Sequence, residues 1–109
     1  MEINMIYITA GSKDEARMIG QTLVSTQLAA CVNIIENMNS MYMWNGKLQD
    51  DKETVLIAKT TKECVSDLIK EVNKLHSYDC PCIVSLPVSD GNPAFLKWIT
   101  EEVQPRSDR

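Results

Sequence analysis

The sequence predicts a single α+β domain over residues 1–109, with the ferredoxin-like split βαβ order, a long β-hairpin and one extra C-terminal helix. Three observations predict this class: an Asn45-Gly46 turn between β-prone segments, two amphipathic segments that begin with helix-capping residues, and two further short strands. The order is strand, helix, strand, strand, helix, strand, helix. Residues 3–103 are expected to form the folded core, and residues 104–109 a loose tail.

The first strand and helix are expected before residue 30. Residues 3–9 alternate in β-prone side chains and end at Ala10-Gly11, which is typical of a strand followed by a turn. Ser12 then predicts a helix start, because its hydroxyl can accept a first-turn N–H while Glu15 reaches back in a capping box. Gly20 lies within the helix and predicts close packing there. The apolar stripe of this helix contains Ala16, Ile19, Leu23, Val24 and Leu28.

The hairpin is expected over residues 30–61. Its Asn-Gly turn matches type I′, which needs a positive φ at both central positions. With this turn fixed, Trp44 faces Lys47, and the same register continued to the base places Ile34 opposite Ile57. The turn therefore predicts the pairing of the whole hairpin.

The hairpin tip carries apolar side chains on both faces. Side chains alternate along a strand, so Met41 and Met43 point to one face while Tyr42 and Trp44 point to the other. The helices of one subunit cannot cover both faces of a projecting strand pair, and contiguous exposed apolar surface marks an interface. These four residues therefore predict self-association. The alternative is a monomer whose aromatic side chains lie singly on the surface.

A second amphipathic helix is expected after the hairpin. The residues Thr60-Thr61-Lys62-Glu63 repeat the capping-box pattern, and Glu71 is expected on the solvent face with the lysines. Two helices would cover one face of a four-stranded sheet and leave the other face open unless another subunit covers it. The apolar face of this helix contains Val65, Leu68, Ile69, Val72 and Leu75.

The last strand and helix are expected near the C-terminus. Residues 83–88 are β-prone, and Pro87 within them predicts a sheet edge or a strand end. Asn92 suits an N-cap and Pro93 suits the first helical position, so they predict the start of a final helix. Pro105 is expected to end it.

Composition limits the partners and the compartment. The net charge is −4 and the chain has no basic run, which argues against nucleic acid or an anionic membrane as a partner. No apolar run approaches the length of about 18 residues that a membrane helix needs, and the first residues lack the basic start of a signal peptide. A cytoplasmic location is therefore expected, with the four cysteines reduced.

The motifs point away from catalysis and leave metal binding open. No Gly-rich phosphate loop, HExxH or G-x-S-x-G is present, so no enzymatic activity is expected. The sulfur of Cys31, Cys80 or Cys82 and the imidazole of His76, the only histidine, are ligand types that suit Cu(I). The structural alternatives are core filling for the cysteines and a favourable helix C-terminal position for His76.

Four ordered motifs lie within residues 5–103. They are Leu28-Ala29-Ala30-Cys31-Val32-Asn33; Tyr42-x-Trp44-x-Gly46-Lys47 with Glu53 and Lys59-Thr60; His76-x-Tyr78-x-x-Pro81; and Leu86-Pro87-Val88 with Gly91 and Leu96-x-Trp98-Ile99. Together they resemble the divalent-cation tolerance family CutA. The resemblance implies a homotrimer built through the hairpin, similarity to PII signalling proteins, a cleft between subunits, and a role in metal tolerance, with copper as the ligand of some members.

The resemblance also implies site residues. Cys82 stands where a glutamate commonly follows Pro81 in the family, which favours a soft ion over a hard one. The alternative function is a PII-like signalling or scaffolding trimer that binds a protein partner without metal. The expected metal ligands are Cys31, His76 and Cys82, and the expected cleft residues are Trp44, Glu53, Lys59, Tyr78 and Trp98.

Overall fold

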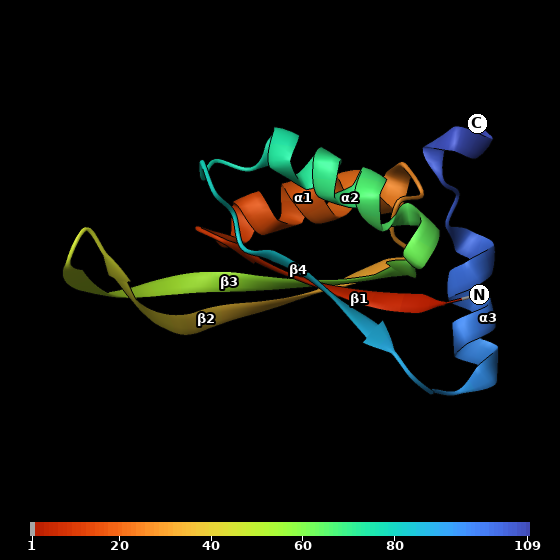
Figure 1. Cartoon of the computed structure of the whole chain (residues 1–109), viewed down its shortest axis with the longest axis horizontal. Coiled ribbons are helices and arrows are strands. Elements are labelled where there is room, and N and C mark those ends of the chain that lie inside the picture. Colours follow the sequence, from red (N-terminus) through yellow and green to blue (C-terminus); the bar gives the residue numbers. More distant parts are fainter. Residues whose placement is uncertain (1) are drawn as a thin grey trace.

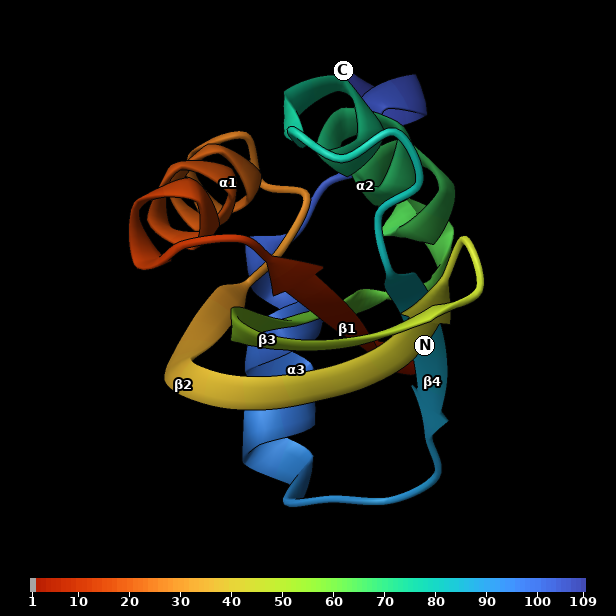
Figure 2. The same cartoon turned by 90° about the vertical axis from the view of Figure 1, so that its left-hand side faces the viewer.

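The computed structural model describes residues 2–109 and has one antiparallel sheet with the strand order β2-β3-β1-β4. Helices α1 and α2 lie side by side on one face of the sheet, and the hairpin of β2 and β3 projects beyond them (Figures 1 and 2). The α+β class with a long hairpin and an extra C-terminal helix is confirmed. The elements are β1 (Ile3–Ala10), α1 (Lys13–Ser25), β2 (Cys31–Trp44), β3 (Lys47–Thr61), α2 (Lys62–Leu75), β4 (Ile83–Val88), α3 (Pro93–Glu102) and the 3₁₀ helix η1 (Arg106–Asp108).

The main core lies between the sheet and the two helices. Ile6 and Ile8 of β1 stand in register with Ala58 and Leu56 of β3, and all four are buried against α1 and α2. Gly20 of α1 lies close to the sheet, where an added Cβ would stand 3.0 Å from a methyl group of Val32. The predicted close packing at this glycine is confirmed, because an added Cβ would press against the Val32 side chain, which would have to shift. The helix contribution comes from Ile19, Leu23, Leu68 and Val72.

A second, smaller core holds α3 across the end of the sheet that is farthest from the hairpin tip (Figure 1). The Asn92 side chain accepts a hydrogen bond from the Ala94 N–H at 3.2 Å, and Pro93 is the first helical residue, as predicted. Pro87 lies in β4, which is an edge strand, so its missing N–H costs no ladder bond on the outer side. No helix in residues 2–109 is both long enough and apolar enough to cross a membrane.

The predicted hairpin register is confirmed at the tip and wrong at the base. Trp44 lies opposite Lys47, but Ile34 pairs with Leu56 rather than with Ile57. A β-bulge between residues 35 and 38 causes the shift, because two residues of β2 there oppose a single residue of β3. Asn37, inside the bulge, has a φ of 61°, a left-handed conformation that asparagine tolerates.

The predicted capping box of α2 is absent. The N-cap is Thr61, and its side chain makes no capping hydrogen bond to the backbone. Thr60 is buried, and its hydroxyl donates to the Leu28 carbonyl at 2.7 Å. The Thr60 hydroxyl therefore ties the start of α2 to the segment after α1 instead of capping the helix.

The C-terminal segment differs from the expected loose tail. Glu71, expected on the solvent face, is only 8% exposed and pairs with the guanidinium of Arg106. The Arg106 N–H also donates to Asp67 at 3.2 Å, and the Arg109 guanidinium donates to the Thr26 carbonyl. Glu71 is buried because the tail folds back over α2, which helical periodicity alone does not predict.

Candidate functional site

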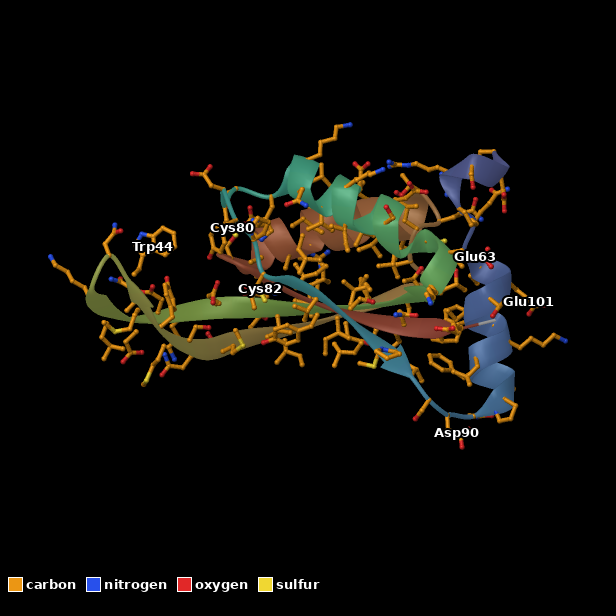
Figure 3. All side chains as sticks on the ribbon, in the orientation of Figure 1. Trp44, Glu63, Cys80, Cys82, Asp90 and Glu101 are labelled. Carbon is orange, nitrogen blue, oxygen red and sulfur yellow. The ribbon has the colours of Figure 1, made fainter. Side chains whose placement is uncertain are left out.

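A groove of about 490 Å³ lies between the outer half of the hairpin and the loop that joins α2 to β4. The side chain of Trp44 stands on the same side of the hairpin as Cys80 and Cys82 (Figure 3). Aromatic rings, carboxylates and thiols line the groove together. The lining residues are Thr9, Tyr42, Trp44, Gln49, Glu53, Tyr78, Asp79, Cys80 and Cys82.

Strand alternation places the hairpin side of the groove. Tyr42 and Trp44 are two residues apart on β2 and both line it, while Met41 and Met43 point to the opposite face. The Tyr42 hydroxyl donates to Asp51 at 2.9 Å, and this hydrogen bond raises the pKa of Tyr42. Tyr42 is thereby held as a neutral phenol over the strand pair.

His76 fixes the loop that forms the other wall. Its ring is buried, and Nδ1 accepts the Tyr78 N–H at 3.1 Å. Nδ1 therefore carries no proton, so Nε2 is the protonated nitrogen and donates to the Thr9 carbonyl at 2.7 Å. Nε2 therefore joins the end of α2 to β1, and Nδ1 holds the loop at Tyr78, so both ring nitrogens are occupied.

Glu15 adds a second anchor to the same loop. One carboxylate oxygen accepts the Ser77 N–H at 2.8 Å, and the other accepts the Gly11 N–H at 3.1 Å. Burial works to raise the pKa of Glu15, but the hydrogen bonds from Ser77 and Gly11 outweigh it and lower the pKa. The Ser12 hydroxyl accepts the Glu15 N–H at 3.1 Å as predicted, while the carboxylate reaches Gly11 rather than the N-cap itself.

Tyr78 connects the loop to the hairpin. Its hydroxyl donates to a carboxylate oxygen of Glu53 at 3.0 Å. Burial and the Glu53 carboxylate raise the pKa of Tyr78 to about 12. The groove therefore presents near neutral pH a neutral phenol that is hydrogen-bonded to the Glu53 carboxylate.

The raised pKa of Tyr78 predicts how stability changes in alkali. The protonated phenol is favoured in the folded state, so its contribution is fully present below the unfolded pKa near 10 and is lost as pH rises toward about 12. An ultraviolet absorbance titration should show one tyrosine ionising near pH 12, absent in Tyr78→Phe. Tyr7→Phe, on β1, is the matched control and should leave that late step in place. A titration with no late step would contradict the hydrogen bond to Glu53.

The predicted metal ligands do not meet within one chain. His76 has no free ring nitrogen. Cys31 is level with Met5 of β1, whereas Cys82 lies beside Thr9, so the two cysteines are separated by about 13 Å along the strands and about 14 Å across them. Within residues 2–109, no three histidine, cysteine or acidic side chains are placed to hold one metal ion.

The predicted cleft residues divide into two groups. Three line the groove: Trp44, Glu53 and Tyr78. Lys59 lies elsewhere, because its ammonium donates to the Asn33 side chain on the sheet. Trp98 lies on α3, where it stacks on Phe95 with ring centroids 5.8 Å apart. The sequence motifs pick out Trp44, Tyr78 and Trp98, but they do not show which of these aromatic residues share one surface in the fold.

Three lining residues, Thr9, Gln49 and Asp79, were not predicted from the sequence, and Cys80 was named only as one of three candidate sulfur ligands. Gln49 could have been found, because the tip register places it opposite Tyr42. Thr9 could not, since its role depends on the loop that crosses the end of β1. Asp79 and Cys80 lie in that loop, whose path depends on the tertiary contacts of His76.

The chain is similar in sequence and in fold to members of one protein family. The family model described as CutA1 divalent ion tolerance protein matches residues 4–102. The divalent-cation tolerance protein CutA of Thermus thermophilus is 41% identical over 97 residues, which is 89% of this chain and 94% of that protein. The protein of the same name from Archaeoglobus fulgidus is 43% identical over 101 residues, with coverage of 93% and 98%. The crystal structure of CutA1 from Oryza sativa matches with a TM-score of 0.93 at 34% identity, covering 95% of each chain.

Proposed function

Because this chain belongs to the CutA1 divalent ion tolerance family, we propose that it acts in metal-ion tolerance as a homotrimer that binds copper in the groove beside its hairpin. The observation that carries the proposal is the groove itself, which is lined by two thiols, three aromatic rings and two carboxylates. The relatives are named for divalent-cation tolerance. The assembly, the metal and the site go beyond those names.

The hairpin tip supports the trimer. The side chains on the face away from the groove, Met41 and Met43, are 65% and 63% exposed, and Leu48 opposite Met43 is 67% exposed. Val84 and Leu86 are also exposed on β4, on the sheet face that α1 and α2 leave uncovered. Exposed apolar side chains gathered at the hairpin tip and on β4 are typical of surfaces that are buried between subunits. Copies of the same chain are the partner we propose for these surfaces.

The donor set of the groove fits a soft ion better than a hard one. Hard divalent ions take six or more oxygen ligands, or several waters with fixed geometry. Thiolates select Cu(I), which is held stably by as few as two sulfur ligands. Cys80 and Cys82 are exposed and both line the groove, so they are the residues that would hold the ion. Bound there, copper would be sequestered as Cu(I) without a change of oxidation state.

A competitive titration with a Cu(I) chelator under reducing conditions tests the copper site. The Cys80→Ser/Cys82→Ser variant should bind Cu(I) at least about tenfold more weakly, because hydroxyls are poor ligands for a soft ion. Cys31→Ser is the matched control and should bind as the unmodified protein does, since Cys31 lies far along the sheet. Undiminished binding after loss of both groove thiols would contradict the copper site.

The second candidate function is a PII-like or scaffolding trimer that binds a protein partner without metal. The exposed aromatic side chains of Phe95 and Trp98 on α3 favour it, because they form an apolar surface, not used in the trimer proposed above, to which another protein can bind. A trimer that shows no copper binding in the titration would support this candidate over the first. The absence of enzymatic activity and the cytoplasmic location stay predictions.

A further inference from the structure

The groove combines an aromatic wall with negative charge. Tyr42 and Trp44 stand on one face of β2, and Tyr78 faces them from the loop. Glu53 and Asp79 supply the carboxylates. We propose that this groove binds a compact organic cation, such as an alkylated ammonium group, between its aromatic rings and its carboxylates. This inference deepens the proposed function and rests on it, because it names the class of small ligand that the same groove takes.

The two strand aromatics form one continuous wall for such a ligand. Tyr42 and Trp44 are two residues apart on β2, about 6.6 Å along the backbone, and both line the groove, so a cation can contact both side chains from one side. Both side chains are more than two-fifths exposed, so their ring faces are open to a ligand. Aromatic faces attract cations, and they favour poorly hydrated organic cations whose desolvation costs little.

The charge of the groove favours a positively charged ligand over a negatively charged one. Two carboxylates line it, and no lysine or arginine is among the lining residues. Within residues 2–109, neither Glu53 nor Asp79 forms an ion pair. One oxygen of Glu53 accepts the Tyr78 hydroxyl, which orients the carboxylate without neutralising it. An anionic ligand such as a nucleotide phosphate would meet repulsion here, whereas an ammonium group would be attracted.

The organic cation and the copper ion would use different parts of the groove. Glu53 and two of the rings come from the hairpin and the third ring from Tyr78, while the thiols come from Cys80 and Cys82 at the end of the loop that precedes β4. Removal of the thiols should therefore leave the binding of an organic cation unchanged. Removal of the Glu53 charge should weaken the binding of the organic cation and leave the binding of copper unchanged.

Calorimetric titration of the full chain with choline chloride tests the proposal, at constant ionic strength. Choline should bind at least about tenfold more tightly than its uncharged isostere, in which carbon replaces the ammonium nitrogen. Glu53→Gln keeps the shape of the side chain and a hydrogen-bonding oxygen but removes the charge, and it should weaken the binding of choline by about tenfold. Trp44→Leu should weaken the binding of choline by a similar factor. Trp98→Leu, which changes the other tryptophan of the chain, should have no effect.

Equal binding of choline and its isostere, or an equal loss in Trp44→Leu and Trp98→Leu, would overturn the proposal. Sedimentation of each variant shows whether it is assembled, and Trp44→Phe, which keeps an aromatic face, should retain most of the choline binding. If choline fails to bind while the trimer and copper binding are intact, only this inference is wrong. If trimer and copper binding are both absent, the proposed function is wrong.

Discussion

The double variant Met41→Asp/Met43→Asp is expected to sediment as single subunits. Both side chains lie on the tip face that points away from the groove, and both are largely exposed in one subunit. If assembly buries them, each contributes about 2 kcal/mol, so the change removes on the order of 10 kcal/mol from a trimer. The aspartates would also be buried without a partner, which adds to the loss. Sedimentation velocity measures the change in size directly.

Met18→Asp is the matched control for that experiment. Met18 is a partly exposed methionine on α1, away from the hairpin tip, and the same substitution there should leave the assembly intact. Far-ultraviolet circular dichroism should show that both variants are folded. An unchanged sedimentation coefficient for the double variant would show that the tip makes no subunit contact.

His76→Ala is expected to lower the free energy of unfolding by about 3 kcal/mol. The substitution empties a buried site and leaves the Thr9 carbonyl and the Tyr78 N–H without their partners. For a domain of this size, that loss lowers the melting temperature by roughly 10–20 °C at a fixed protein concentration. Differential scanning calorimetry is the measurement. The groove should also lose ligand affinity, because the loop that carries its far wall is no longer fixed.

Asn73→Ala tests whether the effect belongs to the His76 hydrogen bonds. Asn73 is exposed on the same helix, three residues before His76, and its replacement should change stability by less than about 0.5 kcal/mol. If His76→Ala melts within a few degrees of the unmodified protein, the imidazole does not hold the loop.

Local features were predictable where a single turn or cap decides them. The Asn45-Gly46 turn was predicted from two residues, and both have the positive φ that a type I′ turn requires. The caps Ser12 and Asn92 were also predicted, since each side chain accepts an N–H within its own first turn. These features depend on neighbours in the sequence, so a local pattern is sufficient.

Features that depend on distant residues were not predictable. The shift of Ile34 by one residue comes from a bulge at Asn37, where no glycine or proline marks an irregularity. The burial of Glu71 depends on Arg106, which lies 35 residues away. Thr60 has the sequence pattern of a cap but satisfies a carbonyl in another segment. In each case a tertiary contact outweighs the local preference.

The candidate site was predicted only in part, because one of its walls depends on contacts between distant residues. Alternation along β2 places Tyr42 and Trp44 on one face, and Tyr78 was included through the family resemblance. The path of residues 77–82 depends on His76 and Glu15, whose hydrogen bonds reach β1 and the start of α1. The position of Cys80 beside the aromatic rings therefore could not be derived from its spacing in the chain.

Sedimentation equilibrium of the unmodified protein at micromolar concentration tests the central claim most directly. The hairpin tip and the uncovered sheet face carry exposed apolar side chains in one subunit, and we propose that assembly buries them. The account predicts a single species with three times the 12.3 kDa mass of one chain. It also predicts a melting temperature that rises with protein concentration, because mass action favours the assembled state. A species of 12.3 kDa that melts at the same temperature over a wide range of dilution would contradict it.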